Sequence, residues 1–416
     1  MSDQLTELVE FARANSPFYK QLYDGVPAGP VRLADLPIID QSEFWAANTM
    51  HGNTALTGPH TDGIIFKTGG TTSAPRLSAY TRPEWKTLAS TFATGLAAAG
   101  VRHGDRVANL LYAGELYSSF ILMLNMLQMQ QVDTVQLPIA GSAPADFKVQ
   151  ALQDFEATVI AAFPTALVAL AQYVKENVGT LPHVRVVLFS GEAFYGDQRR
   201  IVHEAFPNAV IRSLGYGSVD GGVLGAPVEG CEDVRVFRAF EPTNVIEIVD
   251  TETGEPIVEP GRPGRLLVTD LGRRLQPMIR YPVGDLGEWV SFEERTFRLL
   301  GRADEGARVG PVTLHLDYLR GCVDTATGSR VDGFQVVLRR VDAKDQLVLR
   351  FASDATDRAA VLETLSAQVD EISPRFADHV ARGIIQPLAV EWVTPSEIAV
   401  NPRTSKVLRL IDERPV

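Results

Sequence analysis

The chain has 416 residues, of which 45% are hydrophobic and 22% charged, with a formal net charge of −12 at pH 7 and a pI near 5.2. This length and composition are typical of a globular protein with two or three domains, and they exclude a largely disordered chain. The acidic balance, with no cluster of Lys and Arg among aromatic residues, argues against nucleic acid as a partner.

Cysteine usage and the first residues bear on the compartment. Cys231 and Cys322 are far apart and neither has a C-x-x-C partner, so the sequence predicts no disulfide framework and no zinc site. The chain starts with acidic residues and lacks an apolar signal segment, and no run is long enough to span a bilayer. We therefore expect a cytoplasmic protein with no membrane partner.

The first segment with a chemical signature follows the short apolar run at residues 63–66. Residues 68–76 read TGGTTSAPR, which combines glycines, small hydroxyls and one cation. Glycines let backbone N–H groups approach anionic oxygens, hydroxyls add donors, and Arg76 supplies charge, so the segment favours a phosphate-binding turn. A turn without any ligand is the alternative that this segment alone leaves open.

From about residue 60 to 217, apolar strand-like runs alternate with longer helix-like ones, which predicts a largely parallel sheet covered by helices. The expected strands are residues 107–112, 132–137, 158–163, 184–189 and 210–214. The expected helices between them are residues 118–131, 146–155, 165–177 and 198–206. Ligands of such sheets bind at the C-terminal ends of strands, where Gly191, Glu192, Tyr216 and Gly217 fall.

Beyond residue 230 the expected strands are short and separated by Gly and Pro, at residues 245–249, 265–269, 278–281 and 288–292. A hairpin at 334–340 and 346–351, a helix at 357–372 and a strand at 388–393 follow. The sequence thus predicts an α/β fold whose N-terminal domain, residues 1–300, includes a β-rich subdomain at about 230–300. Residues 301–416 are expected to form a small mobile α+β lid.

Three other classes of site are excluded by missing motifs. The chain has no G-x-S-x-G elbow of a serine hydrolase, no G-x-G-x-x-G of a dinucleotide-binding enzyme and no G-x-x-x-x-G-K-[ST] of a P-loop NTPase. Its seven histidines lack metal-ligand spacing.

Six segments in a fixed order carry a family resemblance. They are residues 68–76, 190–192, 215–220, 280–285, 301–304 and 402–409. In this order the chain resembles the adenylate-forming enzymes, which include acyl- and aryl-CoA ligases and firefly luciferase. Residues 11–20 and 36–40 resemble the phenylacetate-CoA ligase branch, and residues 107–117 resemble its short relatives in phenazine antibiotic biosynthesis.

The resemblance implies a role for each motif. Thr68, Gly69, Gly70, Thr71 and Thr72 would hold the β- and γ-phosphates of ATP, with Arg76 in place of the usual lysine. The remaining nucleotide-binding positions would be Gly191, Glu192, Tyr216 on adenine, Gly217, Asp285 on the ribose hydroxyls and Arg302. The catalytic residues implied are Lys406, Arg76 and Thr71, because two anions must meet and cations must dominate the site.

Three positions depart from the family pattern. Asp220 replaces a glutamate that holds Mg²⁺, and a shorter side chain there suits binding through a water. The segment before Lys406 is shorter and lacks a glycine, and Pro311 follows a glycine where relatives carry other residues. Asp304 matches the family's hinge between the two half-reactions. A turn at Asp220 and a solvated tail at Lys406 are the plain alternatives.

The acid pocket expected from the resemblance is lined by aromatic side chains, which would suit an aromatic acid. Its members are Tyr112, Tyr117, Phe163 and Phe194. Aromatic residues at strand ends are also common in plain cores, and that alternative stays open.

Together these features predict an enzyme that uses ATP and Mg²⁺ to convert a carboxylic acid into an acyl-adenylate. The acyl group would then pass to CoA, with a carrier-protein thiol or an amine as alternative acceptors, and a homodimer is left open. A hypothesis of another class is a non-catalytic protein that binds an adenylate or an acid. The altered positions 220, 311 and 406 favour that second hypothesis.

Overall fold

A computed structural model describes residues 2–67, 76–192, 194, 196–302, 306–310, 312–328, 331–342, 344–401 and 406–414. The chain divides into two compact units. The first comprises Met1–Phe163, Tyr173–Gly191 and Ala205–Leu300, and the second comprises Pro164–Gln172, Glu192–Glu204 and Gly301–Val416. No helix among the described residues combines the length and apolarity that a membrane crossing requires.

The first unit begins with helices α1 (Ser2–Asn15), α2 (Pro17–Leu22) and α3 (Gln41–Ala47), with the short η1 (Leu33–Asp35) between the last two. The side chain of Ser16 caps α2 by accepting from the Tyr19 N–H, and Asp40 caps α3 through two N–H groups. Such caps satisfy donors that the first helical turn leaves unpaired. These helices pack on an apolar cluster of this unit that includes Tyr19, Phe44 and Trp289.

A five-stranded parallel sheet follows, in the order β4-β3-β5-β6-β7. Its strands are β3 (Arg106–Asn109), β4 (Val135–Pro138), β5 (Val159–Ala162), β6 (Val186–Phe189) and β7 (Val210–Ser213). Every residue of β5 and β6 is buried, as expected for strands covered on both faces. The five strands predicted from the sequence are confirmed.

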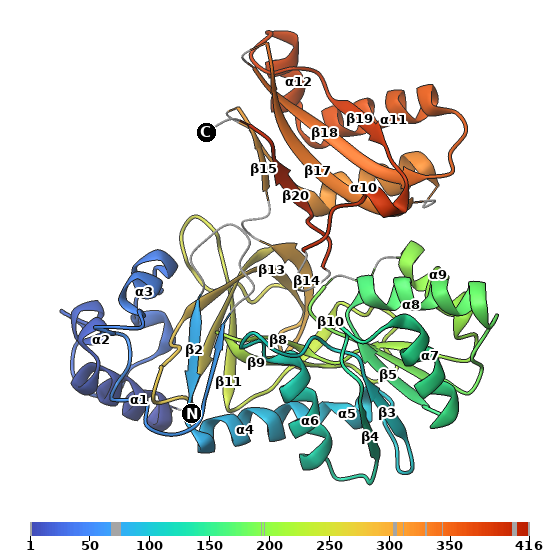
Figure 1. Cartoon of the computed structure of the whole chain (residues 1–416). Coiled ribbons are helices and arrows are strands. Elements are labelled where there is room, and N and C mark those ends of the chain that lie inside the picture. The colour runs from blue at the N-terminus through green and yellow to red at the C-terminus, as the bar shows by residue number, and fades with distance from the viewer. Residues whose placement is uncertain are drawn as a thin grey trace. The chain divides into compact units, whose positions relative to one another are not determined.

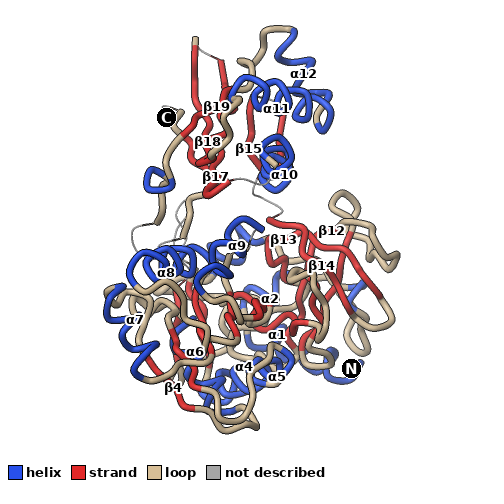
Figure 2. The backbone as a smooth tube through the Cα atoms, turned by 90° about the vertical axis from the view of Figure 1, so that its right-hand side faces the viewer, coloured by secondary structure: helices blue, strands red, loops and turns tan. Residues whose placement is uncertain are grey.

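Helices alternate with these strands, and Figure 2 shows α4 to α7 beside them. The helices are α4 (Arg82–Ala93), α5 (Gly95–Ala98), α6 (Ser119–Met129), α7 (Ala145–Asp154), α8 (Pro164–Asn177) and α9 (Gly196–Ala205). The four helices predicted between the strands are thus confirmed to within a few residues.

A seven-stranded sheet, in the order β11-β12-β13-β14-β10-β9-β8, forms the β-rich part (Figure 1). Its strands are β8 (Tyr216–Ser218), β9 (Gly222–Pro227), β10 (Val236–Ala239), β11 (Asn244–Val249), β12 (Gly264–Asp270), β13 (Tyr281–Ser291) and β14 (Thr296–Arg302). The sheet therefore begins at Tyr216, before the start at about residue 230 that the sequence predicts. The strand expected at 278–281 is wrong, because β13 begins only at Tyr281. A separate antiparallel pair joins β1 (Ile64–Lys67) and β2 (Leu77–Tyr80).

The second unit contains a four-stranded sheet in the order β19-β18-β17-β20, with α10 and α11 against one face (Figures 1 and 2). Strands β17 (Val331–Val341) and β18 (Lys344–Ser353) form an antiparallel hairpin, and β19 (Ala389–Trp392) and β20 (Leu410–Asp412) flank it in parallel. Its other elements beyond residue 300 are β15 (Gly306–Val309), β16 (Val312–His315), α10 (Leu316–Thr327), α11 (Arg358–Ile372), α12 (Pro374–Ala381) and η2 (Pro395–Glu397), and it also includes most of α8 and α9. A separate apolar cluster, which includes Leu319, Val336 and Phe351, forms its core.

Candidate functional site

Part of the predicted site lies outside the described residues. Thr68, Gly69, Gly70, Thr71 and Thr72 fall there, as do Asp304, Pro311 and the side chain of Arg302. The strands that precede and follow the glycine-threonine segment are described: Lys67, at the end of β1, pairs with Leu77, at the start of β2.

Arg76 and Asp220, which are 144 positions apart in the sequence, meet in a polar cluster. We call the side chains of Gln41, Trp45, Arg76, Asp220 and Tyr281 the Asp220 cluster. Arg76 Nη1 lies 3.6 Å from Asp220 Oδ2, and the Tyr281 hydroxyl donates to the same oxygen at 2.7 Å. Asp220 is only 6% exposed, so both partners offset the cost of burying its charge.

Two further side chains complete the Asp220 cluster. Gln41 Nε2 and Trp45 Nε1 each donate to the Tyr281 hydroxyl at 3.1 Å. The Arg76 guanidinium lies 5.5 Å from the centre of the Trp45 ring, within the range of a cation–π contact. Burial raises the pKa of Tyr281 well above its ordinary value, and the neighbouring Asp220 carboxylate raises it further. Tyr281 therefore stays protonated and keeps its donor.

Two residues outside the sequence motifs, Tyr80 and Arg273, bond to the backbone carbonyls next to the Asp220 side chain. The Tyr80 hydroxyl donates to the Val219 carbonyl at 2.6 Å, and Arg273 donates to the Asp220 carbonyl. Arg273 is 1% exposed and lies 4.0 Å from the centre of the Tyr80 ring. It also donates to Ala79 O and Gln276 Oε1. An arginine among polar residues is expected to be exposed, so the local sequence gives no sign that Arg273 is buried.

Tyr216 and Asp285, both predicted to bind the nucleoside, lie together. The Tyr216 hydroxyl donates to Asp285 Oδ2 at 2.5 Å. The Tyr216 ring packs against Phe237 and Phe297, with ring centres 5.6 and 5.9 Å away. With the Tyr281–Asp220 bond, this makes two Tyr–Asp pairs that join residues 216–220 to β13.

Gly217 is fixed by its surroundings. A Cβ at this position would lie 2.6 Å from the Phe92 ring and 2.7 Å from the Gly222 carbonyl, so a larger residue would displace β8 from β9 or from α4. The residue itself is exposed. The backbone here can therefore be approached closely by another molecule, as the sequence predicts for a nucleotide.

Three of the four residues expected to line the acid pocket form one aromatic group. Tyr112 and Tyr117 are 5.6 Å apart in an edge-to-face arrangement, and Tyr117 and Phe163 are 6.2 Å apart in the same geometry. The Lys67 N–H donates to the Leu116 carbonyl at 2.9 Å, so the aromatic group lies beside the end of β1. Phe194 is buried and belongs to the second unit.

Glu192 and Gly191 differ in setting. Gly191 is exposed, at a φ of 76° that favours glycine. Glu192 Oε2 accepts from the N–H and the hydroxyl of Thr165, in the first turn of α8. Burial raises the pKa of Glu192, while the Lys406 charge and the bonds from Thr165 act in the opposite direction. In this arrangement Glu192 serves the helix terminus, where a carboxylate is favourable.

Lys406 lies in an antiparallel backbone pairing of the second unit. Val400 and Val407 form an isolated bridge, and the Asn401 N–H donates to the Lys406 carbonyl at 2.7 Å. Three residues further on, Arg409 pairs with Asp317 of α10 at 2.5 Å. The lysine is therefore attached to a defined backbone pairing.

One carboxylate of the candidate site, that of Asp220, fits a Mg²⁺ ion. Among the described residues, no group of three or more His, Cys, Asp and Glu side chains is placed to hold a metal ion. Mg²⁺ is commonly held by one or two carboxylates together with phosphate oxygens and water. Asp220 fits that pattern as a single carboxylate, with Arg76 as a neighbouring cation that competes for the same oxygen.

Comparison with known proteins points to one group. The family model described as AMP-binding enzyme matches residues 64–272. The phenylacetate-coenzyme A ligase of Thermus thermophilus is 26% identical over 99% of this chain and 95% of its own length. The indoleacetate–lysine synthetase of Pseudomonas savastanoi is 23% identical over 64% of this chain and 62% of its own.

Solved structures share the fold. A 2-hydroxyisobutyryl-CoA ligase, solved in the postadenylation state with 2-HIB-AMP, superposes with a TM-score of 0.77 at 21% identity. The match covers 99% of this chain and 88% of that one.

Proposed function

Because the chain belongs to the AMP-binding enzyme family, whose model spans half of it, we propose that it activates a carboxylic acid with ATP and transfers the acyl group to CoA. In the first step a carboxylate oxygen attacks the α-phosphorus, and pyrophosphate leaves. In the second step the thiol sulfur attacks the acyl carbon, and AMP leaves with the bonding electrons.

The observation that carries this proposal is that two Tyr–Asp pairs join residues 216–220 to one strand, β13, with Arg76 beside one of the pairs. A carboxylate with two oxygens, as in Asp285, suits the two ribose hydroxyls. A cation 3.6 Å from Asp220 is suited to phosphate oxygens. We assign Asp285 and Tyr216 to the nucleoside and Arg76 to the phosphates.

Further roles follow from the resemblance. Thr68, Gly69, Gly70, Thr71 and Thr72 would donate to the phosphates, Arg302 would contact the nucleotide, and Asp304 would act as the hinge. When bound, Mg²⁺ would neutralise phosphate charge, with Asp220 as its protein carboxylate. Lys406 would stabilise the negative charge that builds between the carboxylate and the α-phosphate.

The acid is proposed to be aromatic. Tyr112, Tyr117 and Phe163 form an edge-to-face group of rings. Such a group suits a flat apolar molecule. The full-length relative from Thermus thermophilus bears the name phenylacetate-coenzyme A ligase, which supports the same class of acid. A cytoplasmic location and a homodimer remain predictions from the sequence.

A second acceptor is supported by one relative. The similarity to an indoleacetate–lysine synthetase favours an amine, which would give an amide in place of a thioester. A carrier-protein thiol would use the same chemistry as CoA.

Pyrophosphate–ATP exchange tests the first step. The purified chain is assayed with phenylacetate, indoleacetate and benzoate, with acetate as the small apolar comparison, and then offered CoA, pantetheine or lysine with the product identified by mass. We expect exchange with an aromatic acid and a thioester of CoA. Exchange with none of the acids, together with a thermal shift on adding ATP, would instead favour the non-catalytic binder.

A further inference from the structure

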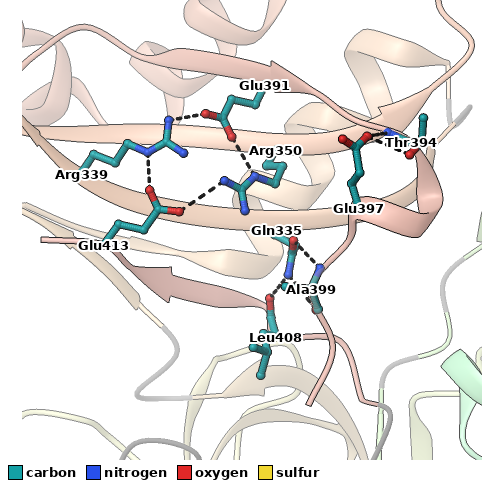
Figure 3. Close-up of polar contacts among 9 residues, drawn as sticks. All are labelled: Gln335, Arg339, Arg350, Glu391, Thr394, Glu397, Ala399, Leu408 and Glu413. Carbon is teal, nitrogen blue, oxygen red and sulfur yellow. Dashed lines mark hydrogen bonds and ion pairs between the residues drawn. The ribbon is translucent and has the colours of Figure 1, made fainter. Parts of the chain in front are cut away.

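A buried side-chain amide bonds the backbone on both sides of the Lys406 region to the sheet of the second unit (Figure 3). We call residues 398–401 and 406–409 the Lys406 hairpin. Its two legs are paired through the Val400–Val407 bridge and a bond of 3.0 Å from the Leu408 N–H to the Ala399 carbonyl. The position of the lysine therefore depends on what holds these legs.

Gln335, on β17, bonds to both legs of the Lys406 hairpin. Its Nε2 donates to the Ala399 carbonyl at 3.0 Å and to the Leu408 carbonyl at 2.6 Å. Its Oε1 accepts from the Ala399 N–H at 3.0 Å. Figure 3 shows this side chain between the two legs. Gln335 is 0% exposed, and such a buried amide is costly unless its donors and acceptor are satisfied.

The outgoing leg is fixed further along the chain. The Val336 N–H donates to the Arg409 carbonyl at 2.8 Å, and β20 then pairs with β17 in parallel. Beyond β20, Glu413 belongs to a ring of four charged side chains with Arg339, Glu391 and Arg350 (Figure 3). The Lys406 hairpin is thus bonded to β17 at two consecutive residues, through the side chain of Gln335 and the backbone of Val336.

Charge stabilisation by a lysine depends on where its ammonium group lies, and a misplacement of about 1 Å can cost roughly 10²-fold in rate. We propose that Gln335 is a positioning residue for Lys406 in acid activation, acting by clamping the two legs of the hairpin. This inference rests on the proposed function of Lys406. It assigns Gln335 no contact with substrate.

The variant Gln335→Met tests this inference, because methionine keeps the length of the side chain and removes its three hydrogen bonds. Gln346→Met is the matched control: it removes a glutamine from the neighbouring strand β18 whose amide donates to Pro387, away from the hairpin. We expect kcat for phenylacetate-dependent pyrophosphate exchange to fall by about 10- to 100-fold in the first variant, with KM for ATP within about twofold.

A role in positioning Lys406 differs from a general role in folding. Thioester formation from supplied phenylacetyl-AMP and CoA should stay within roughly twofold of the unmodified chain, because Lys406 is assigned to the first step only. An equal loss in both steps would assign Gln335 to general stability and overturn the proposal. Pyrophosphate exchange by Gln335→Met at the rate of the unmodified chain would also overturn the proposal.

Hydrogen exchange separates this inference from the proposed function, since it needs no substrate. Backbone amides of the peptide that contains Ala399 should exchange faster in Gln335→Met than in Gln346→Met, while those of α11 keep their rate. Unchanged exchange at Ala399 refutes the clamp. If the unmodified chain activates no acid but Ala399 exchanges faster in the variant, the proposed function fails and the clamp stands.

Discussion

In the first unit the charged side chains of the candidate site are held mainly by other side chains, whereas in the second unit Lys406 is held through the backbone of a hairpin. Asp220 has Arg76 and Tyr281 as partners, and Gln41 and Trp45 bind Tyr281 in turn. Lys406 depends on paired backbone legs and on Gln335.

This difference suggests a division of work. A network of hydrogen-bonded side chains is preorganised and costs little to use in binding, because no group must be reordered. A hairpin whose two legs are bonded to the sheet can place one cation, Lys406, for acid activation without involving it in thioester formation. We therefore expect substitutions in the first unit to affect stability and nucleotide binding, and substitutions at the hairpin to affect a single rate.

The largest expected effect is that of Lys406→Ala. Loss of one electrostatic stabiliser should lower kcat for pyrophosphate exchange by about 10²- to 10³-fold and leave thioester formation from supplied acyl-adenylate nearly unchanged. Lys20→Ala, at an exposed position of α2, serves as the control. A loss of both steps in Lys406→Ala would remove the proposed division between the units.

Arg273→Met should mainly affect stability. It removes the Arg273 donor from the buried carbonyls of Asp220 and Ala79, while the amide oxygen of Gln276 keeps the bond from the Ala79 N–H. The free energy of unfolding should fall by about 3 kcal/mol. The neighbouring Arg274→Met, which breaks a half-exposed pair with Glu7, should cost less than about 1 kcal/mol. Urea unfolding of both variants measures the difference, and equal values would show that the buried network contributes little.

Asp285→Ala should weaken nucleotide binding. Hydrogen bonds to a charged group are worth about 1.5–3 kcal/mol, so KM for ATP should rise roughly 10-fold or more. Asp24→Ala, at an exposed position, is the comparison. An unchanged KM for ATP with a reduced kcat would move Asp285 from binding to chemistry.

The smallest effect is expected at the charged ring of the second unit. The hydrogen bond from Arg339 holds the pKa of Glu413 below its ordinary value. A lowered folded-state pKa gives stability that is present above the ordinary carboxyl pKa and is lost as pH falls through the lowered value. Glu413→Gln should therefore cost about 0.5–1 kcal/mol near pH 7 and almost nothing in strong acid, since half-exposed pairs are weak. Thermal unfolding against pH measures this, with the exposed Glu363→Gln as control.

Much of the fold could be predicted from local patterns. Continuous apolar runs such as residues 159–162 and 186–189 identify buried parallel strands, because both faces of such a strand must be covered. The order of the motifs also indicated the family before any contact was known. The strand expected at 278–281 was wrong, because β13 begins only at Tyr281. Strands β8 to β10 were not predicted, because β8 and β9 flank a glycine-rich segment that resembles a turn, and β10 also pairs with the distant β14.

The identity and order of the chemical groups were thus determined by the sequence itself: a glycine-threonine segment, Tyr216, Asp285 and Lys406 in that order. Only the tertiary structure decided that Arg76 pairs with Asp220, that Arg273 is buried beneath it and that Gln335 clamps the lysine hairpin. These contacts join residues that are about 50 to 190 positions apart. Burial and hydrogen bonding at such separations depend on how whole sheets pack, and no pattern of neighbouring residues encodes that packing.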